Sequence, residues 1–260
     1  MRHFPRKRFG QHFLINSHII AEIIHMIRPV PGDRMIEIGP GLGALTRPLL
    51  NCLGSLQVIE IDRDIVDYLS RNYAEKLIIH NVDALKFDFS MLGERLRIVG
   101  NLPYNISTPL LFHLARFSSL ITDMYFMLQL EVVARMVAQP STADYGRLSL
   151  MLQNRFVMEQ LLIVPAEAFD PPPRVQSAIV YMRPRAKPVI PPEQEKLFGE
   201  LVLAAFSQRR KTLRNTLRHY LAAEDFDQLE IDSGLRAENL SLTHYSAMTQ
   251  HIHTISQTKA

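Results

Sequence analysis

A glycine-rich turn between an apolar segment and a helical pattern constrains the fold of this 260-residue chain more than any other feature. Residues 34–38 are predicted to form a buried strand, residues 39–43 spell GPGLG, and a helix is expected from 44 to about 53. Glycines in such a turn let the backbone approach a ligand and let the helix pack closely against the strand. A glycine turn can also serve geometry alone, so the strands that follow must decide between the two interpretations.

Three further strands are predicted, and each is followed by a side chain that can bind a nucleoside. Glu60 lies at the carboxyl end of a strand that begins at Leu56, where an acid can accept hydrogen bonds from both ribose hydroxyls. Asp83 follows a strand at 76–80, and it either accepts from an adenine amino group or caps a turn. Asn101 follows a strand that begins at Leu96. Ligands bind at the carboxyl edge of open α/β sheets, so we expect an α/β fold with these side chains around one site.

The glycine turn does not favour a dinucleotide as the ligand. Pro40 removes one of the backbone N–H donors that would hold a pyrophosphate in this loop. A nucleoside that carries an amino-acid tail fits the turn as well.

The stretch Asn101-Leu102-Pro103-Tyr104 points to a particular chemistry. The side-chain oxygen of Asn101 and the carbonyl of Leu102 can each accept a hydrogen bond from an exocyclic amine. Tyr104 offers a flat face on which a base can stack. An amine conjugated to a ring is a poor nucleophile, and two acceptors that hold its hydrogens out of the ring plane would localise its lone pair. The alternative is a turn that only ends the strand, with Asn and Pro as turn formers.

Positive charge is concentrated in two clusters, although the net charge is only +3. The first cluster holds Arg2, Arg6, Lys7 and Arg8, and the second holds Arg209, Arg210, Lys211, Arg214 and Arg218. Two such clusters favour a polyanionic partner over an ordinary solvated surface. All of the second cluster except Arg209 is predicted to lie on one side of a helix, whose apolar face holds Phe206, Leu213, Leu217 and Tyr220.

The cysteine count and the lack of long apolar runs exclude several classes of protein. The single cysteine, Cys52, rules out an internal disulfide and a zinc site of clustered thiolates, and we expect no metal. No apolar run approaches 18 residues, so no membrane span is expected. The N-terminus lacks the apolar core of a secretory signal, and we expect a cytoplasmic protein.

Prolines at 184, 188, 191 and 192 mark the best candidate for a domain boundary. We therefore predict one domain at 1–184 and a second, helical domain at 185–260.

Before the boundary, Phe169 and the prolines at 171–173 form a stiff turn, which either places Phe169 over a flipped-out base or anchors an apolar loop. Residues 9–16 form either a ligand lid or an ordinary N-terminal arm, and Ser17 is the predicted N-cap of the first helix.

Five stretches together resemble the KsgA family of small-subunit ribosomal RNA adenine N6,N6-dimethyltransferases. They are FGQHFL at 9–14, EIGPG at 37–41, NLPYNISTP at 101–109, FDPPP at 169–173 and FSQRRKT at 206–212. The resemblance covers essentially the full chain. It implies an α/β, Rossmann-like class I methyltransferase fold that uses S-adenosylmethionine, with a small all-helical C-terminal domain. The implied substrate is a pair of adjacent adenosines in the 3′-terminal hairpin loop of 16S rRNA, met in an immature 30S ribosomal subunit.

The resemblance also implies a set of site residues. Implied cofactor contacts fall on His12, Leu14, Gly39, Gly41, Glu60, Asp83 and Asn101. From the residues themselves we predict Asn101, Leu102, Pro103 and Tyr104 as catalytic residues, and the predicted substrate contacts are Tyr104, Phe169, Arg210, Lys211 and Arg214. Asn is common in the family where this chain has His12, a change that a backbone contact would survive. Glu37 is implied to lie beside the methionine end of the cofactor.

Two alternatives remain open. The Erm family, which methylates 23S rRNA, is the nearest rival, and Leu102, the QRRKT stretch at 208–212 and the long helical tail argue against it. A non-catalytic ribosome-assembly factor would keep the fold without the chemistry, and the intact motif at 101–104 weighs against that interpretation.

Overall fold

The computed structural model describes residues 12–258, without the side chains of Ala74 and Thr258. The N-terminal basic cluster and the first part of the predicted lid lie outside the described residues. The chain divides into two compact units: the first holds Met1–Val133 and Met158–Pro184, and the second holds Ala134–Val157 and Arg185–Ala260.

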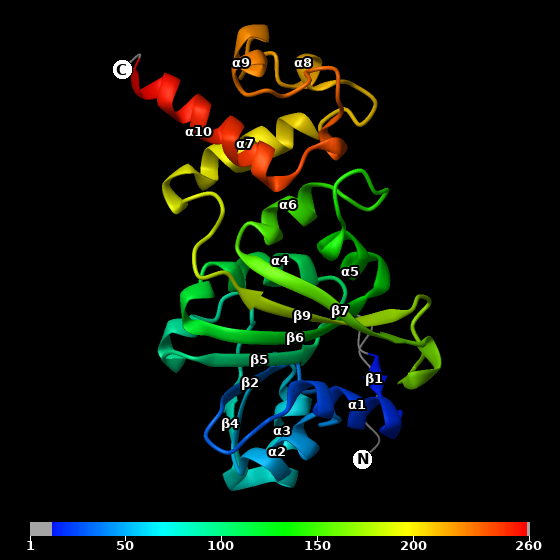
Figure 1. Ribbon diagram of the computed structural model, residues 1–260. Coiled ribbons are helices and arrows are strands. Elements are labelled where there is room, and N and C mark those ends of the chain that lie inside the picture. The colour runs from blue at the N-terminus through cyan, green and yellow to red at the C-terminus, as the bar shows by residue number, and fades with distance from the viewer. Residues whose placement is uncertain (1–11, 259–260) are drawn as a thin grey trace. The chain divides into compact units, whose positions relative to one another are not determined.

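The first unit is built on a seven-stranded sheet with the order β4-β3-β2-β5-β6-β9-β7 (Figure 1). Its strands are β2 (Arg34–Ile38), β3 (Leu56–Ile59), β4 (Leu77–His80), β5 (Leu96–Asn101), β6 (Ile121–Gln129), β7 (Phe156–Val164) and β9 (Ser177–Pro184). Strands β2 to β6 run parallel, and β9 is antiparallel to β6. A separate two-stranded sheet pairs β1 (Phe13–Leu14) with β8 (Phe169–Asp170), residues that are about 155 positions apart in sequence.

The helices within residues 12–258 are α1 (Ser17–Ile27), α2 (Thr46–Leu53), α3 (Arg63–Tyr73), α4 (Ser107–Ala115), α5 (Leu130–Val137), α6 (Arg147–Gln153), α7 (Glu195–Ala205), α8 (Leu213–Thr216), α9 (Ala223–Gln228) and α10 (Leu242–Thr258). Short 3₁₀ helices lie at Ala74–Lys76, Phe89–Leu92, Ser118–Leu120, Ala166–Ala168, Pro192–Gln194 and Ala237–Asn239. Helices α1, α2 and α3 pack on one face of the sheet, and α4 lies on the other (Figure 1). A mostly parallel sheet between helices is the α/β arrangement that the sequence predicts.

Helix α1 shows how local sequence sets an element of this unit. Its buried residues Ile19, Ile23 and Ile27 are four positions apart, which places them on one helical face against the core. The predicted N-cap, Ser17, is wrong by one position. The side chain of Asn16 accepts hydrogen bonds from the backbone N–H groups of His18 and Ile19, so Asn16 is the cap.

The strand order creates a switch point between β2 and β5. From β2 the chain continues through β3 and β4 on one side, and it then returns to add β5 and β6 on the other side of β2. The loops that follow β2 and β5 therefore diverge and leave a crevice at the carboxyl edge of the sheet. This crevice lies between the glycine turn and Asn101.

The second unit corrects two predictions. The segment Ala134–Val157, which the sequence analysis placed in the first domain, groups with the second unit because Ala138, Tyr145 and Leu150 pack into that unit's core. Only the border after Pro184 coincides with the predicted boundary. Helices α7 and α10 contribute further core residues, and the rest come from α8, α9 and the segments between the helices.

The continuous basic helix predicted around 206–220 is also wrong. Helix α7 ends at Ala205, and residues 206–212 form turns before the four-residue helix α8. The backbone N–H of Leu213 donates to the Leu235 carbonyl, and Thr212 forms a bridge with Arg236. Because distant backbone groups pair with this segment, its local helical pattern is overridden.

Candidate functional site

A cavity of about 710 Å³ opens at the switch point of the first unit. Its walls come from the residues before and within β1, the glycine turn, and the segments that follow β3, β4 and β5. It brings together predicted residues from all of these segments: His12, Leu14, Gly39, Gly41, Glu60, Asp83, Asn101, Leu102, Pro103 and Tyr104. Those at or after the ends of β2, β3, β4 and β5 are neighbours because parallel strands end at the same edge of the sheet, whereas Leu14 belongs to the separate sheet of β1 and β8 and His12 directly precedes β1.

Phe169 is placed differently from the other predicted residues of this unit. Its side chain is 3 % exposed and belongs to the hydrophobic core, and its backbone pairs with Leu14. Phe169 is not among the residues that line the cavity. This placement favours the apolar loop anchor that the sequence also allowed, and stacking on a base would require the ring to leave the core.

The predicted basic residues belong to the second unit. Arg210 and Lys211 are exposed in the turn before α8, and Arg214 is exposed on α8 itself. Their role as RNA contacts stays a prediction.

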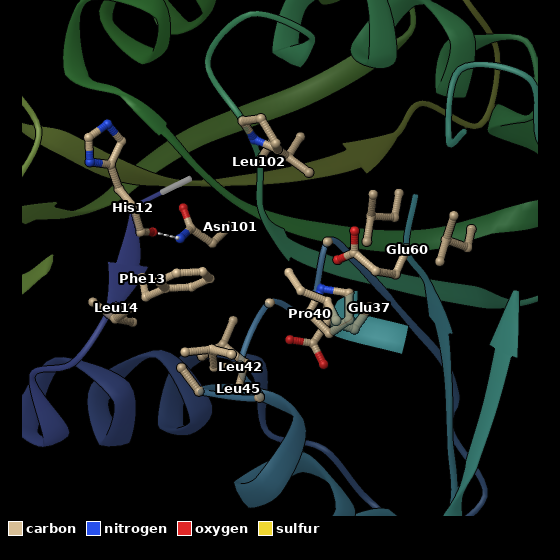
Figure 2. Close-up of a pocket in the computed structure, with 18 of the residues that line it drawn as sticks. His12, Phe13, Leu14, Glu37, Pro40, Leu42, Leu45, Glu60, Asn101 and Leu102 are labelled. Atoms are coloured by element: carbon tan, nitrogen blue, oxygen red, sulfur yellow. Dashed lines mark hydrogen bonds between the residues drawn. The ribbon is translucent and has the colours of Figure 1, made fainter. Parts of the chain in front are cut away.

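Phe13 is a cavity residue that the sequence analysis did not single out. Its ring points from β1 toward the glycine turn (Figure 2). A Cβ atom at Gly41 would lie 3.2 Å from this ring, and Gly41 has φ +53°, so a side chain there would be both crowded and strained. Phe13 belongs to the stretch FGQHFL, which is one of the five stretches that carry the family resemblance. Nothing in that stretch predicts that the ring of Phe13 would contact the glycine turn 28 positions later.

Asn101 is held in one orientation by a backbone contact. Its side-chain Nδ2 donates to the carbonyl of His12 over 3.0 Å, as Figure 2 shows. The amide oxygen Oδ1 accepts no hydrogen bond from the described part of the chain. The carbonyl of Leu102 is likewise without a donor among residues 12–258, while the Leu102 N–H donates to Met127. Two acceptors are therefore left for a ligand beside the cavity, as the sequence motif predicts.

Tyr104 is fixed at its hydroxyl and at its ring. The hydroxyl shares a hydrogen bond of 2.8 Å with the hydroxyl of Ser177. The ring stacks with the imidazole of His12, with a centroid separation of 5.8 Å and an interplanar angle of 27°. An aromatic ring held in this way is a suitable platform for a planar ligand.

Two buried acids line the side of the cavity across from His12 (Figure 2). Burial is the main cause that raises the pKa of Glu37 to about 7, and the nearby charge of Glu60 acts in the same direction. The Thr46 hydroxyl donates a hydrogen bond of 2.6 Å to the Glu37 carboxyl, which lowers the pKa and offsets part of the rise. Burial likewise raises the pKa of Glu60 to about 7, although the N–H of Asp62 donates to its carboxyl over 2.8 Å. These carboxyl groups are poised to lose a proton near neutrality.

Asp83 performs one of its two predicted tasks. Its carboxylate accepts a hydrogen bond of 3.0 Å from the backbone N–H of Leu85, which caps the turn after β4. It also lines the cavity, so the two interpretations are compatible.

The residues described here contain no group of three or more His, Cys, Asp or Glu side chains that could hold a metal ion. None of the helices described is long and apolar enough to cross a membrane.

The raised pKa values make the stability of the protein depend on pH. Between pH 4.5 and about 7 the folded protein keeps a proton on Glu37 that the unfolded chain has lost, so stability falls as pH rises through this window. We expect the wild-type protein to lose on the order of 2 kcal/mol of unfolding free energy relative to Glu37→Gln between pH 5 and pH 8. Urea unfolding of both proteins at several pH values measures this difference. Parallel pH profiles would contradict it.

Comparison with known proteins gives consistent matches over most of the chain. A family model described as "Ribosomal RNA adenine dimethylase" matches residues 2–254. The chain is 83 % identical over 255 residues to the "Ribosomal RNA small subunit methyltransferase A" of Nitrosomonas eutropha, covering 98 % of this chain and 100 % of that protein. It is 79 % identical over 253 residues to the protein of the same name from Nitrosomonas europaea, covering 97 % and 98 %.

Solved structures share the fold. A dimethyladenosine transferase from Plasmodium falciparum matches with a TM-score of 0.79 and 24 % identity, covering 94 % of this chain and 98 % of that one. The 23S rRNA methyltransferase ErmE matches with a TM-score of 0.73 and 23 % identity, covering 93 % and 99 %. These likenesses confirm the predicted Rossmann-like class I fold.

Proposed function

The chain belongs to the ribosomal RNA adenine dimethylase family, and we propose that it dimethylates the N6 amines of two adjacent adenosines in 16S rRNA. The observation that carries this proposal is that Asn101 and Leu102 line the cavity beside the glycine turn, with acceptor oxygens that have no donor among the described residues. The named relatives, at 83 % and 79 % identity, are methyltransferases of the small ribosomal subunit. Their names favour the small-subunit rRNA as the substrate. The likeness to ErmE is no argument for 23S rRNA, since at 23 % identity it supports the fold only.

S-adenosylmethionine is the methyl donor, and the side chains of the cavity fit it. Glu60 is a buried acceptor beside the glycine turn, suited to the ribose hydroxyls, and Asp83 is suited to the adenine amine. Glu37 is a second buried acid of the cavity, and the family resemblance implies that it lies beside the amino-acid end of the ligand. When bound, the cofactor supplies a methyl group on a positively charged sulfonium, and loss of the methyl leaves a neutral thioether.

The residues of the chain would act mainly by positioning the target base. Asn101 Oδ1 and the Leu102 carbonyl accept hydrogen bonds from the adenine amine, which localises the nitrogen lone pair and directs it at the methyl group. Tyr104 stacks on the base and holds its plane. Because no charged leaving group develops, alignment of the reacting atoms is the main contribution that the protein has to make.

The partner is proposed to be an immature 30S subunit, in the cytoplasm. The exposed Arg210, Lys211 and Arg214 of the second unit offer cations for the phosphate backbone of its rRNA.

A radiolabelled methyl-transfer assay on unmethylated 30S particles, with mapping of the labelled nucleotides, tests the function. Label at two adjacent adenosines of 16S rRNA is expected. Label on purified 23S rRNA alone would favour the Erm function, and binding to 30S particles without label would favour a non-catalytic assembly factor.

The role of Glu60 gives a separate prediction for cofactor binding. In Glu60→Gln the charged acceptor for the ribose becomes neutral, and we expect the affinity for S-adenosylhomocysteine to fall about 10- to 100-fold. Isothermal titration calorimetry at pH 8, where Glu60 is ionised, measures the change. Asp67→Asn is the matched control, because Asp67 is exposed on α3 and is not among the residues that line the cavity. Equal affinities of Glu60→Gln and wild type would remove Glu60 from the cofactor site.

A further inference from the structure

His12 makes three contacts, each with a different part of the cavity wall. Its ring Nδ1 donates to the carbonyl of Pro171 over 2.7 Å. Its ring stacks on Tyr104, and its backbone carbonyl accepts the hydrogen bond from Asn101. One residue therefore joins the segment before β1, the loop after β8 and the turn after β5.

The contact with Asn101 decides which end of the amide faces the cavity. The two ends of a side-chain amide have nearly the same shape, but only the oxygen can accept a hydrogen from an adenine amine. The His12 carbonyl can only accept, so it pairs with Nδ2 and leaves Oδ1 for the substrate. Among the described residues, Nδ2 of Asn101 has only the His12 carbonyl as its acceptor.

The side chain of His12 explains why that carbonyl stays in place. His12 lies outside the regular strand β1, which begins at Phe13 and pairs with β8 over two residues only. The ring is anchored at one end by the Pro171 carbonyl and lies against Tyr104, whose hydroxyl is fixed in turn by Ser177. Rotation of the ring or of the backbone would break at least one of these contacts.

We propose that His12 is a positioning residue for methyl transfer, whose anchored ring holds the ring of Tyr104 directly and, by fixing the His12 backbone carbonyl, holds the amide of Asn101. This inference rests on the proposed function. It assigns the His12 side chain to the target base, whereas the sequence resemblance had assigned His12 to the cofactor. The effect of the side chain should therefore fall on turnover and not on cofactor affinity.

The test compares His12→Ala, His12→Phe and the control His25→Ala, since His25 is exposed on α1 and does not line the cavity. We expect His12→Ala to lower kcat about tenfold or more, because a small misplacement of reacting groups is costly. Its affinity for S-adenosylhomocysteine and its melting temperature should stay close to wild type. His12→Phe keeps a ring against Tyr104 but loses the Pro171 bond, so its kcat should lie between the two.

A double-mutant cycle with Tyr104→Ala separates positioning from general damage. If His12 acts through Tyr104 and the adjoining turn, His12→Ala should cost much less kcat when Tyr104 is already alanine. Additive losses, an unchanged kcat in His12→Ala, or a loss confined to cofactor affinity would each overturn the inference. A wild-type protein that binds the cofactor but methylates no rRNA would instead overturn the proposed function.

Discussion

Replacement of Asn101 by alanine should abolish methyl transfer while it leaves cofactor binding only moderately weaker. The variant loses one of the two acceptors that hold the adenine amine, so the lone pair returns to conjugation with the ring. Removal of a preorganised hydrogen-bonding group typically costs 10²- to 10³-fold in kcat, and we expect a loss of about 10³-fold here because alignment is the main catalytic contribution. The loss is measured as radiolabelled methyl incorporated into unmethylated 30S particles.

The structure also supplies controls for this experiment. Asn72→Ala removes an exposed asparagine on α3 that does not line the cavity, so its turnover should match wild type. Asn101→Asp keeps an acceptor, but it places a carboxylate oxygen against the His12 carbonyl that now receives a hydrogen from Nδ2. We therefore expect Asn101→Asp to be impaired as well. Normal turnover by Asn101→Ala would end the proposed mechanism.

Much of the arrangement of the cavity follows from local sequence patterns. Glu60, Asp83 and Asn101 could be placed together because each follows an apolar segment, and parallel strands bring such positions to one edge. The contacts of His12 with Pro171 and of Tyr104 with Ser177 could not be predicted in this way. They join residues that are 159 and 73 positions apart, and no periodicity in the sequence reports such pairs.

The wrong prediction of a long basic helix has the same origin. The pattern from Phe206 to Tyr220 has helical spacing, but the backbone of Leu213 pairs with Leu235. A propensity is a weak preference, and long-range hydrogen bonds override it when the two compete for the same N–H group. The motif around Phe169 allowed either base stacking or an apolar anchor, and it said nothing of the pairing with Leu14 at this buried position.

Arg97 on β5 is the centre of an ionic network at the opposite end of the sheet from the cavity. Its guanidinium contacts Asp33 at 2.6 Å and Asp123 at 2.9 Å, and it also donates to the carbonyl of Ile27 at the end of α1 over 2.7 Å. The three charged side chains are only 13–16 % exposed. The arginine therefore compensates two carboxylates that water reaches poorly, and it joins α1 to β5 and β6.

Arg97→Met should unfold far more easily than wild type. The substitution leaves Asp33 and Asp123 partly buried without their cation, and breaking one side of a buried ion pair typically costs about 3–5 kcal/mol. At the lower end of that range we expect the melting temperature to fall by about 6–12 °C. Differential scanning calorimetry measures the shift. Arg71→Met is the control, because Arg71 is exposed on α3 and its loss should change the melting temperature little.

The same variant separates stability from binding. Arg97 lies four residues before Asn101 on β5, about 13 Å away along the strand, so the cavity should keep its shape while the protein is folded. We therefore expect the folded Arg97→Met protein to bind S-adenosylhomocysteine at 15 °C with an affinity within a few-fold of wild type. Arg97→Lys keeps the charge but loses the fork that reaches both acids, so its melting temperature should lie between the two. If the melting temperature of Arg97→Met equals that of wild type, the two carboxylates do not need the arginine for stability. If the folded variant instead loses affinity for S-adenosylhomocysteine, the two ends of the sheet are energetically coupled.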